Sequence, residues 1–191
     1  MKIVNQRELG NLLNECPNSV DSACELANAE SQARRERNSQ LILEAFLEKY
    51  RDKLSDAEKA KVYTNLAFYY SDDGNIKEYN YLSAAVKLKS PYIETYRGLA
   101  LYHFSAYREN GSVEELKKSL RAFEKGIIVS NDYEMNFGYA VCLFELKEYE
   151  KAKTTFEELL KDYPNRMRLL LSIAYCDVYL GYKDQAMNRL K

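Results

Sequence analysis

The sequence predicts an all-α protein built from antiparallel helix pairs, and three observations lead to this fold class. Gly and Pro are scarce, at 7 and 3 in 191 residues, which excludes a collagen-like chain and a β-sandwich with many turns. Polar residues that begin helices and glycines that end them alternate along the chain. Apolar residues recur with helical spacing, and no alternating strand pattern competes with them.

Helix boundaries can be read from the polar residues and glycines between the apolar runs. Starts are indicated where a small polar residue precedes a Glu by three positions, because the two side chains can then cap free backbone N–H groups. Gly74, Gly111 and Gly181 follow apolar runs, where a left-handed residue closes a helix. The start pairs are Ser22 with Glu25, Ser55 with Glu58, Asn75 with Glu78, Ser112 with Glu115 and Asn131 with Glu134. The expected helices are 6–15, 22–37, 40–54, 57–72, 76–89, 92–109, 113–129, 132–146, 149–162, 166–180 and 183–191.

An internal repeat relates the first helices of successive pairs. A repeat of this length with two helices per unit is typical of a solenoid, whose units bury their apolar faces against one another. In the second helices, Ala152 and Phe156 recur at the equivalent positions of the next unit as Ala186 and Leu190. In the first helices, the same pattern of positions recurs from unit to unit: Tyr63, Leu66, Ala67 and Tyr70; Tyr96, Leu99, Ala100 and His103; Asn136, Tyr139, Ala140 and Leu143; Leu170, Ile173, Ala174 and Asp177.

These residues resemble the tetratricopeptide repeat family over about residues 60–191. Tyr63, Leu66, Ala67 and Tyr70 stand where the family has Trp, Leu, Gly and Tyr. Ala152, Phe156 and Pro164 stand where it has Ala, Phe and Pro. The sequence departs from the family in having no Trp and in placing Asn136 and Asp177 at positions of large residues. The resemblance implies a right-handed superhelical array of antiparallel helix pairs, an α-solenoid, and a role in binding proteins.

The repeat register predicts the domain organisation. We expect an N-terminal helical extension at 1–59, followed by repeats at 60–92, 93–132, 133–166 and a truncated 167–191. Ala33 and Ala45 precede Ala67 and Tyr79 by one repeat length, which leaves open whether the extension is itself a degenerate repeat. Extra residues around 107–111 are expected to lengthen the first helix of their repeat or the turn after it. Because the last helix stops at Lys191, we expect either a longer natural protein or a homodimer formed through this uncapped repeat.

Few residues suggest catalysis or a bound cofactor. The single histidine, His103, lies at a packing position of its repeat and is expected to be a buried structural residue. Cys142 and Cys176 occupy equivalent positions of successive repeats, beside the small-residue positions, where free thiols pack as apolar groups. Cys16 and Cys24 flank Pro17, and we expect them to be free thiols as well. No zinc-ligand spacing or glycine-rich phosphate loop occurs, so the sequence predicts no enzyme and no cofactor.

The charge pattern argues against nucleic acid and membrane partners. Lys and Arg number 28 against 29 Asp and Glu, a net charge of −1, and any such binding would have to be local. Arg34, Arg35 and Arg37 are expected at the end of a helix, where cations stabilise the carbonyl terminus. Lys117, Arg121 and Lys125 are expected on a solvated convex face, with Glu114 paired to Lys118. With no targeting segment and an inert set of thiols, a cytoplasmic location is expected.

A second apolar stripe on the first helix of each pair predicts the binding site. In the tetratricopeptide repeat family, which this sequence resembles, these positions line the concave surface. We therefore expect a groove for an amphipathic helix or an extended peptide. Close packing of neighbouring inner helices is the alternative explanation, and Gly98 and Gly138 on this stripe fit either a shallow channel or close helix contact. Four of the predicted groove residues, Phe137, Val141, Phe144 and Tyr175, are expected to be anchors, and Glu94, Arg97, Glu134 and Arg168 are expected at the rim. The full predicted set is Asn65, Phe68, Glu94, Arg97, Leu101, Phe104, Glu134, Phe137, Val141, Phe144, Arg168, Leu171 and Tyr175.

Two functions follow as hypotheses. The first is a non-catalytic module that binds a protein or peptide partner, as an adaptor, sensing or assembly part of a larger protein. The second is a regulatory domain in which a bound peptide changes the curvature of the array and so controls an attached enzyme or DNA-binding domain.

Overall fold

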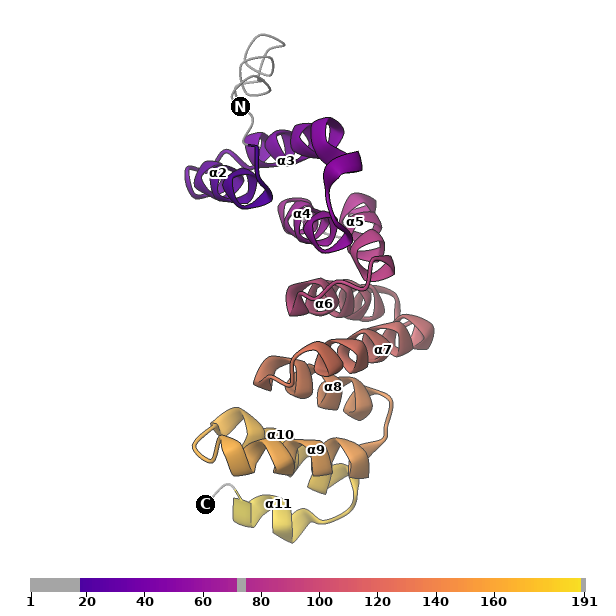
Figure 1. Cartoon of the computed structure of the whole chain (residues 1–191). Coiled ribbons are helices and arrows are strands. Elements are labelled where there is room, and N and C mark those ends of the chain that lie inside the picture. Colours follow the sequence, from indigo (N-terminus) through magenta and orange to yellow (C-terminus); the bar gives the residue numbers. More distant parts are fainter. Residues whose placement is uncertain (1–17, 72–74, 190–191) are drawn as a thin grey trace. The chain divides into compact units, whose positions relative to one another are not determined.

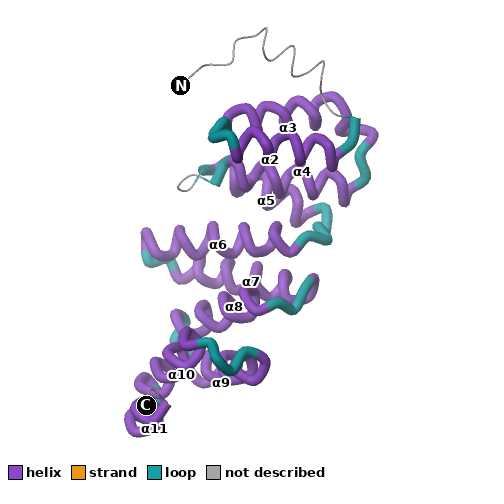
Figure 2. The backbone as a smooth tube through the Cα atoms, turned by 90° about the vertical axis from the view of Figure 1, so that its left-hand side faces the viewer, coloured by secondary structure: helices purple, strands orange, loops and turns teal. Residues whose placement is uncertain are grey.

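The computed structural model describes residues 18–71 and 75–189, and throughout these ranges the chain consists of α-helices joined by short turns, with no strand (Figures 1 and 2). The prediction of an all-α fold is confirmed for the described residues. The expected helix at 6–15 and the turn at Gly74 lie outside them. The chain divides into two compact units, Met1–Leu99 and Ala100–Lys191, and the division falls within helix α6.

Unit 1 consists of two helix hairpins and the start of α6. Helices α2 (Val20–Gln32) and α3 (Glu36–Tyr50) form the first hairpin, and a short 3-10 helix, η1 (Arg51–Lys53), follows α3. Helices α4 (Asp56–Tyr69) and α5 (Ile76–Lys87) form the second, and α4 also contacts α2 and α3. Leu43, Phe46 and Leu66, all fully buried, lie in the core between the hairpins.

Unit 2 continues the same arrangement. The second half of α6 (Ile93–Asn110) precedes α7 (Val113–Val129), α8 (Tyr133–Glu145), α9 (Tyr149–Asp162), α10 (Met167–Tyr179) and α11 (Lys183–Arg189). From α7 onward each helix contacts the next one in the chain. Ala140, Phe156, Leu169 and Ile173 are buried in its core. The predicted packing positions Ala140, Phe156 and Ile173 are therefore interior, whereas the predicted Leu170 is half-buried and its neighbour Leu169 takes the core position.

Several predicted helix boundaries match the capping seen in the structure. Ser55 begins α4 with a reciprocal capping box, in which its hydroxyl accepts a hydrogen bond from the Glu58 N–H and the Glu58 carboxylate accepts one from the Ser55 N–H. Gly111 and Gly181 adopt φ angles of 69° and 87°, the left-handed conformation that ends α6 and α10 at little steric cost.

Helix α3 begins at Glu36, four residues before the expected start at 40, and two predicted capping residues are wrong by one to three positions. Helix α2 begins after Ser19, whose hydroxyl accepts a hydrogen bond from the Ser22 N–H, and Ser22 itself lies within the helix. Helix α8 begins after Asp132 rather than Asn131. In both places a neighbouring Ser or Asp can make the same cap, so the spacing to a later Glu does not select the first helical residue.

The arginines at 34, 35 and 37 do not lie at the end of a helix as predicted. Helix α2 ends at Gln32, Arg34 occupies the turn with a φ of 58°, and Arg37 lies in the first turn of α3. Arg35 donates two hydrogen bonds of 2.6 Å from its guanidinium to the Glu30 carboxylate, which spans the turn. This local ion pair allows the chain to turn earlier than the apolar pattern indicates.

The first hairpin and the hairpin of α6 and α7 contain a similar hydrogen bond. The buried Ser119 hydroxyl of α7 donates to the Ala100 carbonyl of α6 at 2.8 Å, and the buried Ser39 hydroxyl of α3 donates to the Ala27 carbonyl of α2 at 2.6 Å. Ala27 thus takes the place of Ala100. The predicted match through Ala33 is wrong, because Ala33 is exposed at the end of α2.

The extra residues around 107–111 lengthen both helices of their hairpin. Helices α6 and α7 have 18 and 17 residues, compared with 13 and 14 in α8 and α9. Because Ser119 still bonds to Ala100, the added residues lie between these two positions, around the turn at Gly111. The expectation of a longer first helix is confirmed, and the second helix is longer as well.

Glu78 leads to a prediction about pH. Burial raises its pKa from 4.5 to about 7 in the folded protein. Because the folded protein binds this proton more tightly than the unfolded chain does, the free energy of unfolding is highest below the pKa that Glu78 has in the unfolded chain. It falls as the pH rises through the pKa that Glu78 has in the folded protein. We therefore expect Glu78→Gln to be more stable than the natural protein at about pH 8 but not at about pH 4.5, as measured by urea unfolding. Glu150→Gln, in the first turn of α9, is the control; an equal gain at both pH values for Glu78→Gln would contradict the prediction.

Candidate functional site

The predicted groove residues are divided between the two units. Unit 1 holds Asn65 and Phe68 on α4 and Glu94 and Arg97 on the first half of α6. Unit 2 holds the others on three first helices of their pairs: Leu101 and Phe104 on α6; Glu134, Phe137, Val141 and Phe144 on α8; Arg168, Leu171 and Tyr175 on α10. Within each helix their spacing of three or four places them on one face.

Large apolar side chains on this face are open to solvent. Phe68 is 68% exposed, Leu101 55% and Tyr175 61%, and Leu171 is also exposed at 41%. Single exposed apolar residues are common in folded proteins. Leu171 and Tyr175 lie one turn apart on α10 of unit 2, and such a group is instead typical of a surface that a partner covers.

A small cleft in unit 2 brings three of the predicted residues together. Val141, Phe144 and Tyr175 line a cleft of about 80 Å³ together with Phe156 and Ser172. Helices α8, α9 and α10 therefore all contribute to it. The Ser172 hydroxyl donates to the Arg168 carbonyl of its own helix at 2.9 Å, so the lining is predominantly apolar. Such a cleft suits an uncharged side chain.

An aromatic cluster adjoins this cleft through Phe144. The Phe144 ring meets the rings of Tyr149 and Tyr179 edge-on, with centroids 5.2 and 5.3 Å apart. Tyr149 and Tyr179 stack on each other at 4.8 Å. These contacts hold the Phe144 ring in place. The apolar stripe of the first helices does not include Tyr149, which lies on a second helix, or Tyr179, which lies beyond the last stripe position.

Phe137 is not an exposed anchor, and that part of the prediction is wrong. Its side chain is 4% exposed. The ring packs against the rings of Tyr133 and Phe156 at 5.7 and 5.3 Å, and the Arg168 guanidinium lies 3.9 Å from its centroid. Arg168, predicted at the rim, is exposed and also covers Phe137 by a cation–π contact. The alternative explanation, burial by neighbouring helices, therefore holds for Phe137 but not for Leu171 or Tyr175.

The other predicted polar residues differ in what they can offer a ligand. Glu94 and Glu134 are exposed, whereas Arg97 is half-buried. The Asn65 side-chain amide donates to the Lys61 carbonyl one turn earlier, at 2.9 Å. Among the predicted rim residues, Glu94, Glu134 and Arg168 are thus exposed to a partner.

The residues whose chemistry is best suited to catalysis, one histidine and two cysteines, are buried and have structural roles. His103 is buried, as predicted, and its Nδ1 lies 2.6 Å from Glu115 Oε2. The Lys118 ammonium donates a hydrogen bond to the same carboxylate, and this bond is the main reason why the pKa of Glu115 lies below its usual value. Cys142 and Cys176 are fully buried, and burial raises the pKa of each thiol to about 11. At neutral pH these thiols are protonated and therefore poor nucleophiles.

Metal sites and membrane-spanning segments can be assessed over residues 18–71 and 75–189. No group of three His, Cys, Asp or Glu side chains there is placed to hold a metal ion. No helix in these ranges is both long and apolar enough to cross a bilayer.

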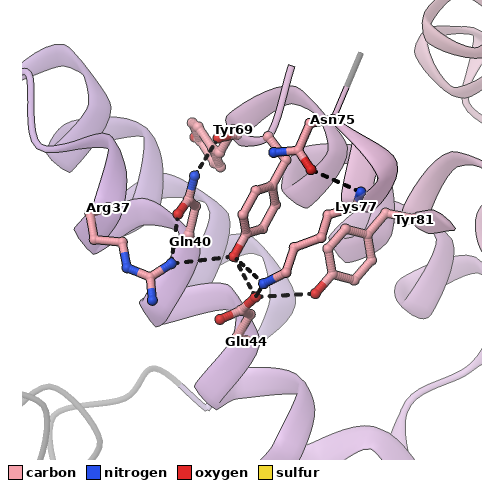
Figure 3. Close-up of polar contacts among 8 residues, drawn as sticks. Arg37, Gln40, Glu44, Tyr69, Asn75, Lys77 and Tyr81 are labelled. Carbon is pink, nitrogen blue, oxygen red and sulfur yellow. Dashed lines mark hydrogen bonds and ion pairs between the residues drawn. The ribbon is translucent and has the colours of Figure 1, made fainter. Parts of the chain in front are cut away.

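Unit 1 contains a larger, open cavity of about 500 Å³ whose lining is mixed in charge. Glu44, on its wall, accepts hydrogen bonds from the hydroxyls of Tyr70 and Tyr81 at 2.6 and 3.3 Å and lies 3.5 Å from the Lys77 ammonium (Figure 3). This cluster ties α3 to α4 and α5, and we assign it a structural role. The lining residues are Glu44, Leu47, Glu48, Arg51, Asp52 and Tyr81.

Comparison with known proteins identifies the repeat in unit 2. Residues 135–166 match the sequence model of the tetratricopeptide repeat. The fold is similar to the structure titled "Crystal structure of YrrB: a TPR protein with an unusual peptide-binding site", with a TM-score of 0.73, 14% identity, and coverage of 95% of this chain and 88% of that chain. It is also similar to the structure titled "Crystal structure of MamA protein", with a TM-score of 0.72, 16% identity, and coverage of 90% and 87%. The search of curated proteins gave no match.

Proposed function

We propose that this chain, which has the fold of tetratricopeptide repeat proteins and matches the repeat itself at residues 135–166, is a non-catalytic protein-interaction module. Its binding surface is the face formed by α8 and α10 in unit 2. The observation that carries this proposal is the cleft lined by Val141, Phe144 and Tyr175, with exposed Leu171 beside Tyr175 on the same helix.

The cleft and its surroundings have the properties of a peptide-binding surface. The lining can receive one apolar side chain, and the exposed Tyr175 ring can cover the peptide next to it, because Tyr supplies rigid contact area with a polar tip. The similar YrrB structure is described as having a peptide-binding site. We therefore infer that the partner is a peptide segment, either helical or extended, with an apolar residue in this cleft.

The proposal includes the absence of catalysis and a cytoplasmic location. It is supported by the structural roles of His103 and of the buried thiols of Cys142 and Cys176. The three described cysteines, at 24, 142 and 176, are all free, which suits a reducing compartment.

Peptide selection followed by substitution tests the binding face. Peptides selected on the full natural chain should bind Tyr175→Glu at least about tenfold more weakly, because a charge is introduced beside an apolar contact. Ile76→Glu is the control, since Ile76 and Tyr175 are equally exposed at 61% and Ile76 begins α5 in unit 1. Affinities are measured by fluorescence anisotropy, and circular dichroism checks that both variants stay helical.

The same measurement can refute the proposal. Equal affinity of Tyr175→Glu and the natural chain for every selected peptide would remove this face as the binding site. An equal loss in Ile76→Glu would show that the effect is not specific to the face.

A further inference from the structure

Helix α7 carries a row of exposed cations along one side. Lys117, Arg121 and Lys125 are spaced by four residues, and all three are exposed. Val113 and Val129, four residues beyond each end, are also exposed, but their separation of 16 positions places them on nearly opposite sides of the helix. We call the three cations the α7 ridge. At about 1.5 Å per residue, the three cations span roughly 12 Å of helix.

The cations of the ridge form no ion pair among the described residues, in common with Arg108, Lys161 and Lys183 but unlike Lys118 on the same helix. Lys118 pairs with Glu115 at 2.6 Å, Lys151 with Glu148 at 2.5 Å, and Lys153 with Asp177 at 2.5 Å. The sequence predicted Glu114 as the partner of Lys118, whereas the structure pairs Lys118 with Glu115, which also bonds to His103. On α7, Lys118 is therefore neutralised by Glu115, whereas Lys117, Arg121 and Lys125 are open to a partner.

Two exposed glutamates define which anion the ridge can accept. Glu114 and Glu124 are exposed on the same helix as the three cations. A continuous polyanion such as a nucleic acid backbone or an anionic lipid surface would place negative charge against these glutamates as well as against the cations. A protein segment can instead place its carboxylates opposite the cations and leave neutral or basic residues opposite the glutamates.

We propose that the α7 ridge binds an acidic helical segment of another protein. A helix with Glu or Asp at every fourth position presents carboxylates on one side at the spacing of Lys117, Arg121 and Lys125. This surface shares no residue with the cleft of α8 and α10, so it adds a second interaction site that does not depend on the first.

A designed probe tests this proposal on the full chain. The probe is a labelled synthetic helical peptide with Glu at every fourth position, and its partner probe has Gln in place of each Glu. The test variant combines Lys117→Gln, Arg121→Gln and Lys125→Gln. The control variant has the same net charge through Arg108→Gln, Lys161→Gln and Lys183→Gln, which are exposed positions outside the ridge.

The expected result is specific to both the probe and the ridge. The natural chain and the control variant should bind the Glu probe within about twofold of each other, and the test variant at least about tenfold more weakly. The Gln probe should bind all three proteins weakly, and raising the salt to about 0.3 M should weaken the Glu probe. Equal binding of the two probes, or an equal loss in both variants, would overturn the proposal. So would tighter, ridge-dependent binding of single-stranded RNA or of phosphatidylserine vesicles than of the Glu probe.

Discussion

Replacing Asp177 by Ala should lower the free energy of unfolding by about 3–5 kcal/mol. Asp177 has no exposed surface, and its carboxylate lies 2.5 Å from the Lys153 ammonium of α9 and 2.8 Å from Nε of Arg189 in α11. Arg189 also pairs with Glu157 at 2.7 Å. Without the carboxylate, two cations that are largely removed from water lose their shared partner, and this leaves buried charge uncompensated.

Urea unfolding monitored by circular dichroism measures this effect. Asp184→Ala, at an exposed position in the first turn of α11, is the control and should change stability by less than about 0.5 kcal/mol. The double variant Asp177→Ala with Arg189→Ala should be less destabilised than the sum of its single variants, since one unpaired cation is removed. A loss below about 1 kcal/mol for Asp177→Ala would contradict the role assigned to this network.

Gly138→Ala should lower the free energy of unfolding by about 2–3 kcal/mol, whereas Gly98→Ala should have little effect. A Cβ atom at Gly138 would overlap the ring of Phe123, closer than real contacts allow, and this ring is buried in unit 2. A Cβ at Gly98 would meet Leu82 Cδ2 at 3.0 Å, the end of a flexible side chain. At Gly98 the gain in helix propensity of about 1 kcal/mol offsets the small shift.

The two glycine variants control for each other because both replace a helix-interior Gly by Ala. Thermal and urea unfolding of the pair should therefore separate overpacking from helix propensity. If Gly138→Ala were as stable as the natural chain, the close approach of α7 and α8 at this point would not be as described. The same geometry answers the question left by the sequence: at Gly138 the missing side chain serves close helix contact rather than an open channel.

The helices and their interior faces were predictable because local signals determine them. Ala100, Ala140 and Ala174, which define the repeat, are all buried, and the capping box at Ser55 forms as expected. Boundaries failed at the turn of 33–35, where the ion pair of Arg35 with Glu30 ends α2 early. Such an ion pair depends on how two side chains meet across a turn, and the spacing of apolar residues carries no information about that geometry.

The candidate site was predictable only in part, since its members are covered or exposed by residues from other helices. Phe137 follows the same stripe as Val141, but Arg168 of α10 and Phe156 of α9 bury its ring. The polar Asp177 was visible as a departure from the repeat. Its partners Lys153 and Arg189 were not, because they lie on α9 and α11 and meet Asp177 only in the packed unit.

Site-specific photo-crosslinking in the native cell most directly tests the central claim that α8 and α10 form a partner-binding face. A photoreactive phenylalanine analogue at position 175 should crosslink the chain to a partner protein, and the same analogue at position 76 should not. Digestion of the product should yield a peptide of the partner that binds the natural chain and binds Leu171→Ser more weakly. Crosslinks at neither position, or the same products from both, would contradict a binding face at α8 and α10.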